Sequence, residues 1–272
     1  MDTIDLSDRT VLITGATDGL GRGVALELAR QGARVLLHGR DAERLRDTER
    51  AVGEAATGAA PRTYLADFAS LAEVKRMAEE IVAAQPRIDV LISNAGIGMD
   101  IPGGGERMES ADGHELRFAV NYLAGWALTR RLLPTLDSSR PARIVNVSSA
   151  GQAAIDFDDV MLDRDYSGVR AYCQSKLAQI LSTRTLAEEL DGRGVTVTCL
   201  HPATYMPTKI VPSPISSLEE GVDATLRLAV DPALEGVSGV YFNGTNEARP
   251  NPQADDLEAR RRLEELSREL AG

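Results

Sequence analysis

The feature that most constrains the fold of this chain is its alternation of short apolar runs with longer amphipathic segments. Runs rich in β-branched residues, such as TVLIT at 10–14 and RVLLHG at 34–39, predict buried strands. Each run is followed by a segment with helical spacing of apolar residues, such as VALELARQGA. This alternation predicts a parallel sheet that is covered on both faces. Right-handed crossovers then give a doubly wound α/β fold.

The same alternation continues along the chain and predicts about seven strands in total. Helices are expected from about 111 to 136, around Tyr172, over 217–230 and from about 253. No internal repeat or low-complexity linker divides the sequence, so we expect a single domain over residues 1–272. Two loops rich in Pro and Gly, GIGMDIPGGGE and ATYMPTKIVPSPISS, follow strands. They should therefore lie at the carboxyl edge of the sheet, where such folds bind ligands.

Composition argues against several classes of function. The formal net charge of −11 disfavours nucleic acid as a main partner, because binding a phosphate backbone needs a basic surface. The two cysteines, Cys173 and Cys199, and the three histidines, His38, His114 and His201, show no metal-ligand spacing. The sequence has no run of about 18 apolar residues and no signal-peptide pattern. We therefore expect a cytoplasmic protein with no metal site, no disulfide and no membrane span.

The turn TGATDGLG, residues 14–21, follows the first predicted strand and opens a helix. Its glycines let the backbone approach a ligand, and the helix N-terminus offers free N–H groups to a pyrophosphate. This context favours dinucleotide binding over a purely structural turn. Gly15, Gly19 and Gly21 have the spacing G-x-x-x-G-x-G, which differs from the G-x-G-x-x-G of many dinucleotide folds.

This spacing resembles that of the short-chain dehydrogenase/reductase family, whose further elements follow in order. SNAG at 93–96 is similar to the family's N-N-A-G element, with Ser93 in place of the first Asn. VNVSS at 145–149 and YCQSK at 172–176 resemble its serine strand and its Y-x-x-x-K helix. The 22 residues between Ser149 and Tyr172, and the ending GVSGVYFNGTNEARPNPQA, most resemble the retinol-dehydrogenase-like branch. The resemblance implies a Rossmann-fold oxidoreductase that transfers a hydride between nicotinamide and a carbonyl or alcohol.

The resemblance implies that Asn121, Ser149, Tyr172 and Lys176 carry the chemistry. Lys176 lies one helical turn from Tyr172, so its charge should favour the phenolate and lower the tyrosine pKa. Tyr172 then acts as acid or base, because hydride transfer to a ketone leaves negative charge on its oxygen. By resemblance, Ser149 holds the substrate oxygen, Asn121 supports a water chain to the lysine, and Lys176 also binds the nicotinamide ribose. Cys173 should point elsewhere on the helix.

NADP(H) is the expected cofactor, with NAD(H) as the alternative. Arg40 lies 19 residues past Gly21, where a guanidinium can grip a 2′-phosphate, although a solvated helix-start residue is the other reading. Asp18 argues against NADP(H) by charge, unless it simply caps the first helix. Asp67 resembles a family residue beside the adenine, with a plain turn aspartate as the alternative. The expected cofactor-binding residues are Gly15, Thr17, Asp18, Gly19, Leu20, Gly21, Arg40, Asp67, Phe68, Asn94, Ala95, Gly96, Tyr172, Lys176, Pro202 and Thr208.

The segment 203–217 is expected to cover the substrate. It departs from the family because Pro202-Ala203 replaces Pro-Gly and the following Thr is one place late, so Thr204 and Thr208 both remain candidates for the nicotinamide contact. Its apolar residues predict a small hydrophobic carbonyl or alcohol as substrate. The resemblance implies pairing through the helices after the fourth and fifth strands, which are apolar enough here for that role, so a homodimer or homotetramer is the expectation that the family gives. A non-catalytic NADP(H)-binding regulator is the alternative function.

Overall fold

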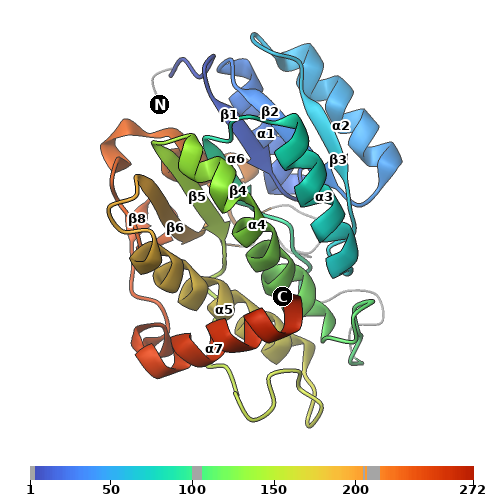
Figure 1. The fold of residues 1–272 in the computed structure, drawn as a ribbon, viewed down its shortest axis with the longest axis vertical. Coiled ribbons are helices and arrows are strands. Elements are labelled where there is room, and N and C mark those ends of the chain that lie inside the picture. Colours follow the sequence, from blue (N-terminus) through green and yellow to red (C-terminus); the bar gives the residue numbers. More distant parts are fainter. Residues whose placement is uncertain (1–3, 100–105, 205, 207–214) are drawn as a thin grey trace.

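A computed structural model describes residues 4–99, 106–204, 206 and 215–272. Its strands form one sheet in the order β3-β2-β1-β4-β5-β6-β7-β8, in which β1 to β7 are parallel and β8 is antiparallel (Figure 1). The strand bounds are β1 Thr10–Ile13, β2 Arg34–Gly39, β3 Arg62–Leu65, β4 Val90–Ser93, β5 Ala142–Val147, β6 Val195–His201, β7 Tyr241–Asn243 and β8 Asn246–Glu247. The predicted doubly wound α/β fold is confirmed. The extra strand, β8, has only two residues, too few for a hydrophobic pattern to reveal.

Helices cover both faces of the sheet. Their bounds are α1 Gly19–Arg30, α2 Ala42–Ala55, α3 Leu71–Ala84, α4 Ala124–Ser138, α5 Gly168–Glu189, α6 Leu218–Val230 and α7 Leu257–Ala271, with a π-helix, η1, at Phe118–Leu123 and short 3₁₀ turns, η2 and η3, at Pro232–Leu234 and Pro252–Asp255. α1 packs against α2 and α6 on one face, whereas α3, α4 and α5 lie on the other. Among the described residues, no helix is long and apolar enough to cross a bilayer.

The helix expected from about 111 begins later than the sequence suggests. Gly113 has a φ of +81°, which ends any helix there, and Glu109 pairs with Glu115 in an isolated bridge. The π-helix η1 follows and continues directly into α4. Asn121 therefore sits on a widened helical turn, a geometry that often occurs at functional sites.

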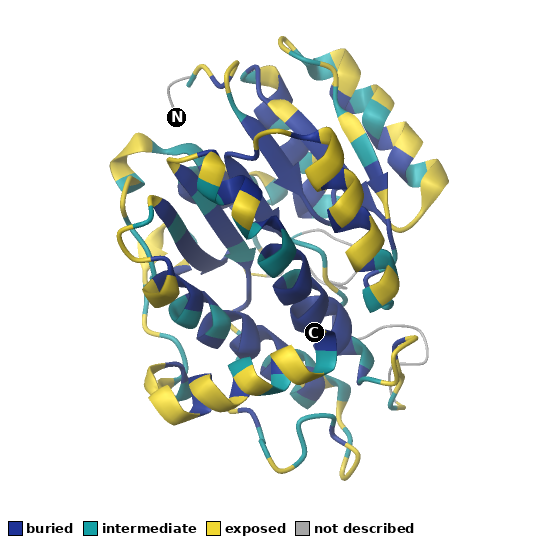
Figure 2. Cartoon of the chain, viewed as in Figure 1, coloured by how far each residue is buried: buried dark blue, intermediate teal, exposed yellow. Residues whose placement is uncertain are grey.

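The central strands are buried on both sides, as Figure 2 shows by their dark colour. Leu12 and Leu91 face α3, α4 and α5, whereas Val11 and Ile13 face α1, α2 and α6. This burial explains why the strands read as continuous apolar runs rather than as alternating ones. It also leaves the ends of the strands as the places where polar side chains can gather.

The C-terminal helix α7 packs against α5 and also contacts α4. The Tyr122 hydroxyl lies 2.7 Å from Ser267 Oγ, and the Trp126 indole donates a hydrogen bond of 3.0 Å to Glu264. Arg130 on α4 also pairs with Glu264, at 2.8 Å. The last helix of the chain therefore occupies part of the α4–α5 surface through which pairing was expected.

Candidate active site

The predicted site elements meet at the carboxyl ends of three neighbouring strands, β1, β4 and β5. The glycine turn follows β1, and residues 94–96 follow β4. Ser149 is the second residue after β5. Helix α5 passes over the same edge and carries Tyr172 and Lys176. The parallel order of the strands brings together elements that are up to 160 residues apart in sequence.

The glycine turn is hydrogen-bonded to the SNAG element. Gly15 has a φ of +66°, and a Cβ atom there would lie 2.8 Å from Cα of Ala95. The amide of Asn94 donates to the carbonyls of Thr14 and Gly15, at 2.9 and 3.0 Å. Thr14 Oγ1 in turn accepts hydrogen bonds from the backbone N–H groups of Asn94 and Ala95. Gly15 therefore lets the turn pack directly against Ala95, and the turn and the SNAG element form one hydrogen-bonded unit at the N-terminus of α1, the kind of position where such folds bind a pyrophosphate.

His38 supports this turn from the neighbouring strand β2. Its Nδ1 accepts a hydrogen bond of 3.1 Å from the Gly15 N–H, and its Nε2 donates one of 3.0 Å to the Ala66 carbonyl. The ring stacks on Phe68 at a centroid distance of 4.2 Å. Burial lowers the His38 pKa to about 4, so the ring is neutral at physiological pH, as the two hydrogen bonds require. Sequence reasoning assigned His38 no role at the site.

A charged corner lies where the 2′-phosphate of NADP was expected. Asp18 caps α1 by accepting a hydrogen bond of 2.9 Å from the Gly19 N–H, and it also pairs with Arg44 at 2.5 Å. Arg44 lies in the first turn of α2 and was not predicted as a site residue. Arg40 is exposed at the end of β2. Arg40 and Arg44 therefore both lie close to the start of α2, and Arg44 is the one that contacts Asp18.

Asp67, expected beside the adenine, and Phe68, expected among the cofactor-binding residues, both make contacts within the protein. The Asp67 carboxylate accepts a hydrogen bond of 2.9 Å from the Ala69 N–H, which is the turn role that sequence left open. The Phe68 side chain is only 4% exposed and packs on His38. Leu20 is likewise a core residue, so its side chain faces away from the turn's ligand side. For Phe68 and Leu20, only the backbone remains to contact a ligand.

Ser149 and Tyr172 share a side-chain hydrogen bond. Ser149 Oγ also accepts a hydrogen bond of 3.0 Å from the Gly151 N–H. The Tyr241 hydroxyl and the Gln152 amide donate to the Ser149 carbonyl, at 3.1 and 3.0 Å. Tyr241 and Gln152 were not predicted, because they come from the distant strand β7 and from the loop after β5. They hold the backbone of the serine while its hydroxyl faces the tyrosine.

The expected lowering of the Tyr172 pKa by Lys176 is wrong for this structure. Burial raises the pKa of Tyr172, and the hydrogen bond from Ser149 only partly offsets that effect. Lys176 Nζ lies 5.8 Å from the tyrosine ring centroid and donates to the Val147 carbonyl at 2.9 Å and to Gln179 Oε1 at 3.1 Å. Burial also lowers the Lys176 pKa to about 8, which weakens its positive charge at neutral pH and above.

Cys173 was expected to point away from the site, but its side chain lies next to Tyr172. A Cβ atom at Gly151 would lie 3.4 Å from Cys173 Sγ and 3.8 Å from a ring carbon of Tyr172. The thiol and the phenol therefore border the same glycine. Burial raises the pKa of Cys173, so the group stays a protonated thiol and is a poor nucleophile.

Asn121 joins the segment after β4 to helix α5. Its Oδ1 accepts a hydrogen bond of 2.7 Å from the Ile97 N–H, and its Nδ2 donates to Ser175 Oγ at 2.9 Å. A Cβ atom at Gly96 would lie 3.2 Å from Asn121 Oδ1 and 3.5 Å from Lys176 Nζ. Asn121 and Lys176 thus meet over Gly96, and a bulkier residue there would separate them.

The comparisons with known proteins agree with this geometry. The model of the short chain dehydrogenase family matches residues 9–214. The chain belongs to this family. It is therefore an NAD(P)-dependent oxidoreductase, and its relatives are retinol-dehydrogenase-like.

Retinol dehydrogenases 13 and 14 of Homo sapiens are both 38% identical to this dehydrogenase. Each alignment covers 97% of this chain, with 85% and 86% of the respective relative. Among solved structures, a short chain dehydrogenase from Shigella flexneri in complex with NADP is 28% identical, with a TM-score of 0.73 over 90% of this chain and 100% of that one. Nicotinamide cofactor binding follows from the family and from these relatives.

Part of the predicted cover of the dehydrogenase is described. Pro202 is buried directly after β6, and His201 Nε2 lies 3.1 Å from Thr204 Oγ1. Met206 packs against the α1–α2–α6 side of the core, next to Gly221. Thr208 and most of the segment 203–217 lie outside the described residues, so the nicotinamide contact there stays a prediction.

Proposed function

We propose that this dehydrogenase is an NADP(H)-preferring enzyme that interconverts a hydrophobic aldehyde or ketone and the corresponding primary or secondary alcohol. A nicotinamide cofactor, when bound, supplies or accepts the hydride. The observation that carries the proposal is the convergence of Ser149, Tyr172 and Lys176 at the carboxyl end of β5. This set combines a hydroxyl donor, a phenol and an amine over the turn that fits the cofactor.

Each of these residues has a distinct role in the proposal. Ser149 Oγ donates a hydrogen bond to the substrate oxygen, since its backbone is held by Tyr241 and Gln152. Tyr172 Oη gives a proton to that oxygen during reduction and takes one during oxidation. Its raised pKa keeps the phenol protonated at neutral pH, which is the form that donates. Lys176, over Gly96, is placed to bind the ribose next to the nicotinamide.

The preference for NADP(H) is supported by the charges around Asp18. An acid in this corner argues against a 2′-phosphate, but the carboxylate of Asp18 is paired with Arg44. Two guanidinium groups, Arg40 and Arg44, follow β2, and the carboxylates of Asp18 and Asp41 both lie beside Arg44. A guanidinium matches the oxygens of a phosphate through two hydrogen bonds, which makes this corner suited to the 2′-phosphate.

The hydrophobic substrate is supported by two observations. The matched relatives are named retinol dehydrogenases, and retinol is a long apolar alcohol. The sequence of the expected cover, 203–217, is also rich in apolar residues. We therefore propose retinoid-like alcohols and aldehydes, and other apolar ketones, as the substrate class.

The test is turnover of retinol, retinal and a panel of apolar ketones with each nicotinamide cofactor, in the wild type and in Tyr172→Phe. We expect kcat to fall by roughly 10²–10⁴-fold in the variant, because the proton donor is lost. The Kd for NADPH should change little. Tyr166→Phe is the matched control, because the Tyr166 hydroxyl contacts Arg117 and Glu115 rather than Ser149. Retention of most of the rate in Tyr172→Phe would show that the tyrosine is not the acid.

A further inference from the structure

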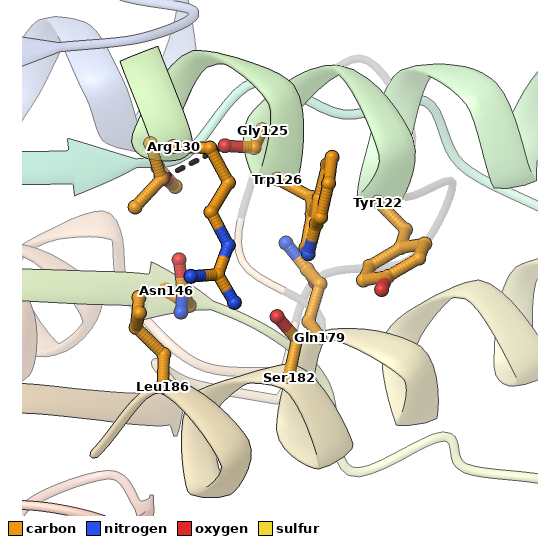
Figure 3. A pocket seen from close by; sticks show the side chains of 10 residues that line it. Tyr122, Gly125, Trp126, Arg130, Asn146, Gln179, Ser182 and Leu186 are labelled. Atoms are coloured by element: carbon orange, nitrogen blue, oxygen red, sulfur yellow. Dashed lines mark hydrogen bonds between the residues drawn. The ribbon is translucent and has the colours of Figure 1, made fainter. Parts of the chain in front are cut away.

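A small cavity, partly open to solvent, lies between α4, α5 and the sheet (Figure 3). Its volume is about 20 Å³, whereas a water molecule needs roughly 10–15 Å³ measured in this way. Ser93 and Asn146 of the sheet, Trp126 and Thr129 of α4, and Gln179 and Ser182 of α5 are among its lining residues. The cavity therefore has room for one water molecule next to the polar side chains of Ser93 and Gln179.

Ser93 gives an independent reason to expect a ligand there. Its Oγ is buried and has no hydrogen-bond partner among the described residues. Its neighbour across the β4–β5 pair, Asn146, donates its amide to Thr183 Oγ1 at 2.9 Å. A buried hydroxyl without a hydrogen-bond partner destabilises the fold, and a water in the cavity would supply that partner.

Gln179 connects the cavity to the active site. Its Oε1 accepts the hydrogen bond of 3.1 Å from Lys176 Nζ, and its side chain rises from α5 into the space below α4. One side chain therefore touches both the catalytic amine and the cavity. The other partner of Nζ is the backbone carbonyl of Val147, at 2.9 Å.

We propose that the cavity binds one water molecule, which is hydrogen-bonded to Ser93 Oγ and to the amide of Gln179. Held in this way, Gln179 is a positioning residue that keeps the amine of Lys176 directed toward Gly96 and the ribose side of the site. The inference rests on the proposed function, because it concerns the same lysine. It adds a water site. It also gives a physical role to Ser93, which stands in place of the first asparagine of the N-N-A-G element.

The charges around Lys176 allow a sharp test. No carboxylate in the described part of the chain lies within ion-pair distance of Nζ. The titratable groups nearby are Tyr172 on the same helix, and Tyr122 and Arg130 on the α4 side of the cavity, where Glu189 and Glu264 pair with Arg130. The charge state of Lys176 is therefore sensitive to its hydrogen-bond partners, and burial already lowers its pKa to about 8.

The experiment is an NMR titration of the full chain labelled with ¹³C at lysine Cε, without substrate or cofactor. The sequence has only three lysines, Lys75, Lys176 and Lys209, so the signals are few and can be assigned with Lys→Arg variants of Lys75 and Lys209. Gln179→Glu should raise the Lys176 midpoint, because it places a carboxylate beside the ammonium group. Gln179→Leu should lower it, because the charged form loses an acceptor.

Ser93→Ala tests the water. It should lower the Lys176 midpoint in the same direction as Gln179→Leu, but by less, because the water loses one partner. Thr129→Val is the matched control, since the Thr129 hydroxyl lines the cavity but is already bonded to the Gly125 carbonyl at 2.7 Å (dashed line in Figure 3). This control should leave the midpoint unchanged.

Two results would overturn the inference. If both Gln179 variants keep the wild-type midpoint, Gln179 does not position the amine. If Ser93→Ala leaves the Lys176 titration midpoint as unchanged as Thr129→Val does, the water does not hold Gln179. Gln179→Met replaces either Gln179 variant that fails to fold, with an expected lowering of the midpoint. The titration measures no turnover, so its outcome does not depend on the proposed function. If the midpoints do not shift, the Tyr172→Phe test still stands. If Tyr172→Phe keeps its rate, the titration can still be interpreted.

Discussion

The carboxylate of Asp18 and the guanidinium of Arg44 form an ion pair of 2.5 Å between the start of α1 and the first turn of α2. Both side chains are more than 40% exposed, so the pair itself contributes only about 0–1 kcal/mol. Arg44 is therefore free to exchange its partner at little cost. A 2′-phosphate, with more negative charge than one carboxylate, is a better partner for it.

Cofactor preference should follow these charges. We expect Arg40→Leu and Arg44→Leu each to weaken NADPH binding by roughly ten- to a hundredfold, because each removes a charge-assisted hydrogen bond worth roughly 1.5–3 kcal/mol. NADH binding should change little, and Asp18→Asn should tighten NADPH binding several-fold. Calorimetric titration with both cofactors gives the two dissociation constants directly.

The matched control for this prediction is Arg50→Leu. Arg50 lies on the same helix, pairs with Asp47 and is far along α2 from its first turn. It should leave both cofactors unaffected. Equal losses of NADH and NADPH affinity in the Arg40 and Arg44 variants would show that these residues do not bind the 2′-phosphate.

His38 should make folding stability depend on acid pH. Its pKa is about 4 in the folded state and about 6.5 in an unfolded chain, so the unfolded state binds the proton first. Stability is thus full above about pH 6.5 and falls as the pH drops toward 4. In His38→Leu the stability should no longer show this part of its pH dependence. The variant should also bind the cofactor more weakly, because the Gly15 N–H loses its acceptor. Urea unfolding at several pH values measures the slope, and equal slopes in wild type and variant would contradict the prediction.

Asn121 should affect stability as well as activity. Asn121→Leu leaves the Ile97 N–H without its acceptor and the Ile97 carbonyl without the Nδ2 donor, whereas Ser175 Oγ keeps its bond to the Tyr172 carbonyl. We expect a loss of roughly 2–4 kcal/mol, since each unsatisfied buried group costs about 1–3 kcal/mol. Denaturant unfolding measures this loss in the free energy of unfolding. Tyr172→Phe is the comparison, because it should lose activity with a smaller loss of stability. A stable but inactive Asn121→Leu would point instead to a purely catalytic role.

Helix α7 should keep the α4–α5 surface from pairing with a second copy. Leu263 is buried in the contact between α7 and the core, so Leu263→Arg should displace the helix and cost several kcal/mol, roughly 3 or more. The exposed surface around Trp126 should then promote association, seen by light scattering as a higher mass than that of the wild type. Glu269→Arg, on the exposed side of α7, is the control. A wild-type dimer that cross-links through α4 would contradict this prediction.

The sequence by itself determined the architecture and the main elements of the site. The alternation of apolar runs and amphipathic segments reflects backbone geometry that is local, so it predicted the doubly wound sheet. The glycine turn and the four-residue spacing of Tyr172 and Lys176 are also local, and parallel topology then places them at one edge. The strand–turn–helix context was enough to indicate a dinucleotide.

Only the tertiary structure decided how these groups act on one another. The pairing of Asp18 with Arg44, the support of Gly15 by His38 and the coverage of α4 and α5 by α7 join residues that are far apart in sequence. The direction of the Tyr172 pKa shift was wrong in the sequence analysis because spacing shows charges but not burial. Desolvation depends on every side chain packed around the phenol, and no local pattern encodes that packing.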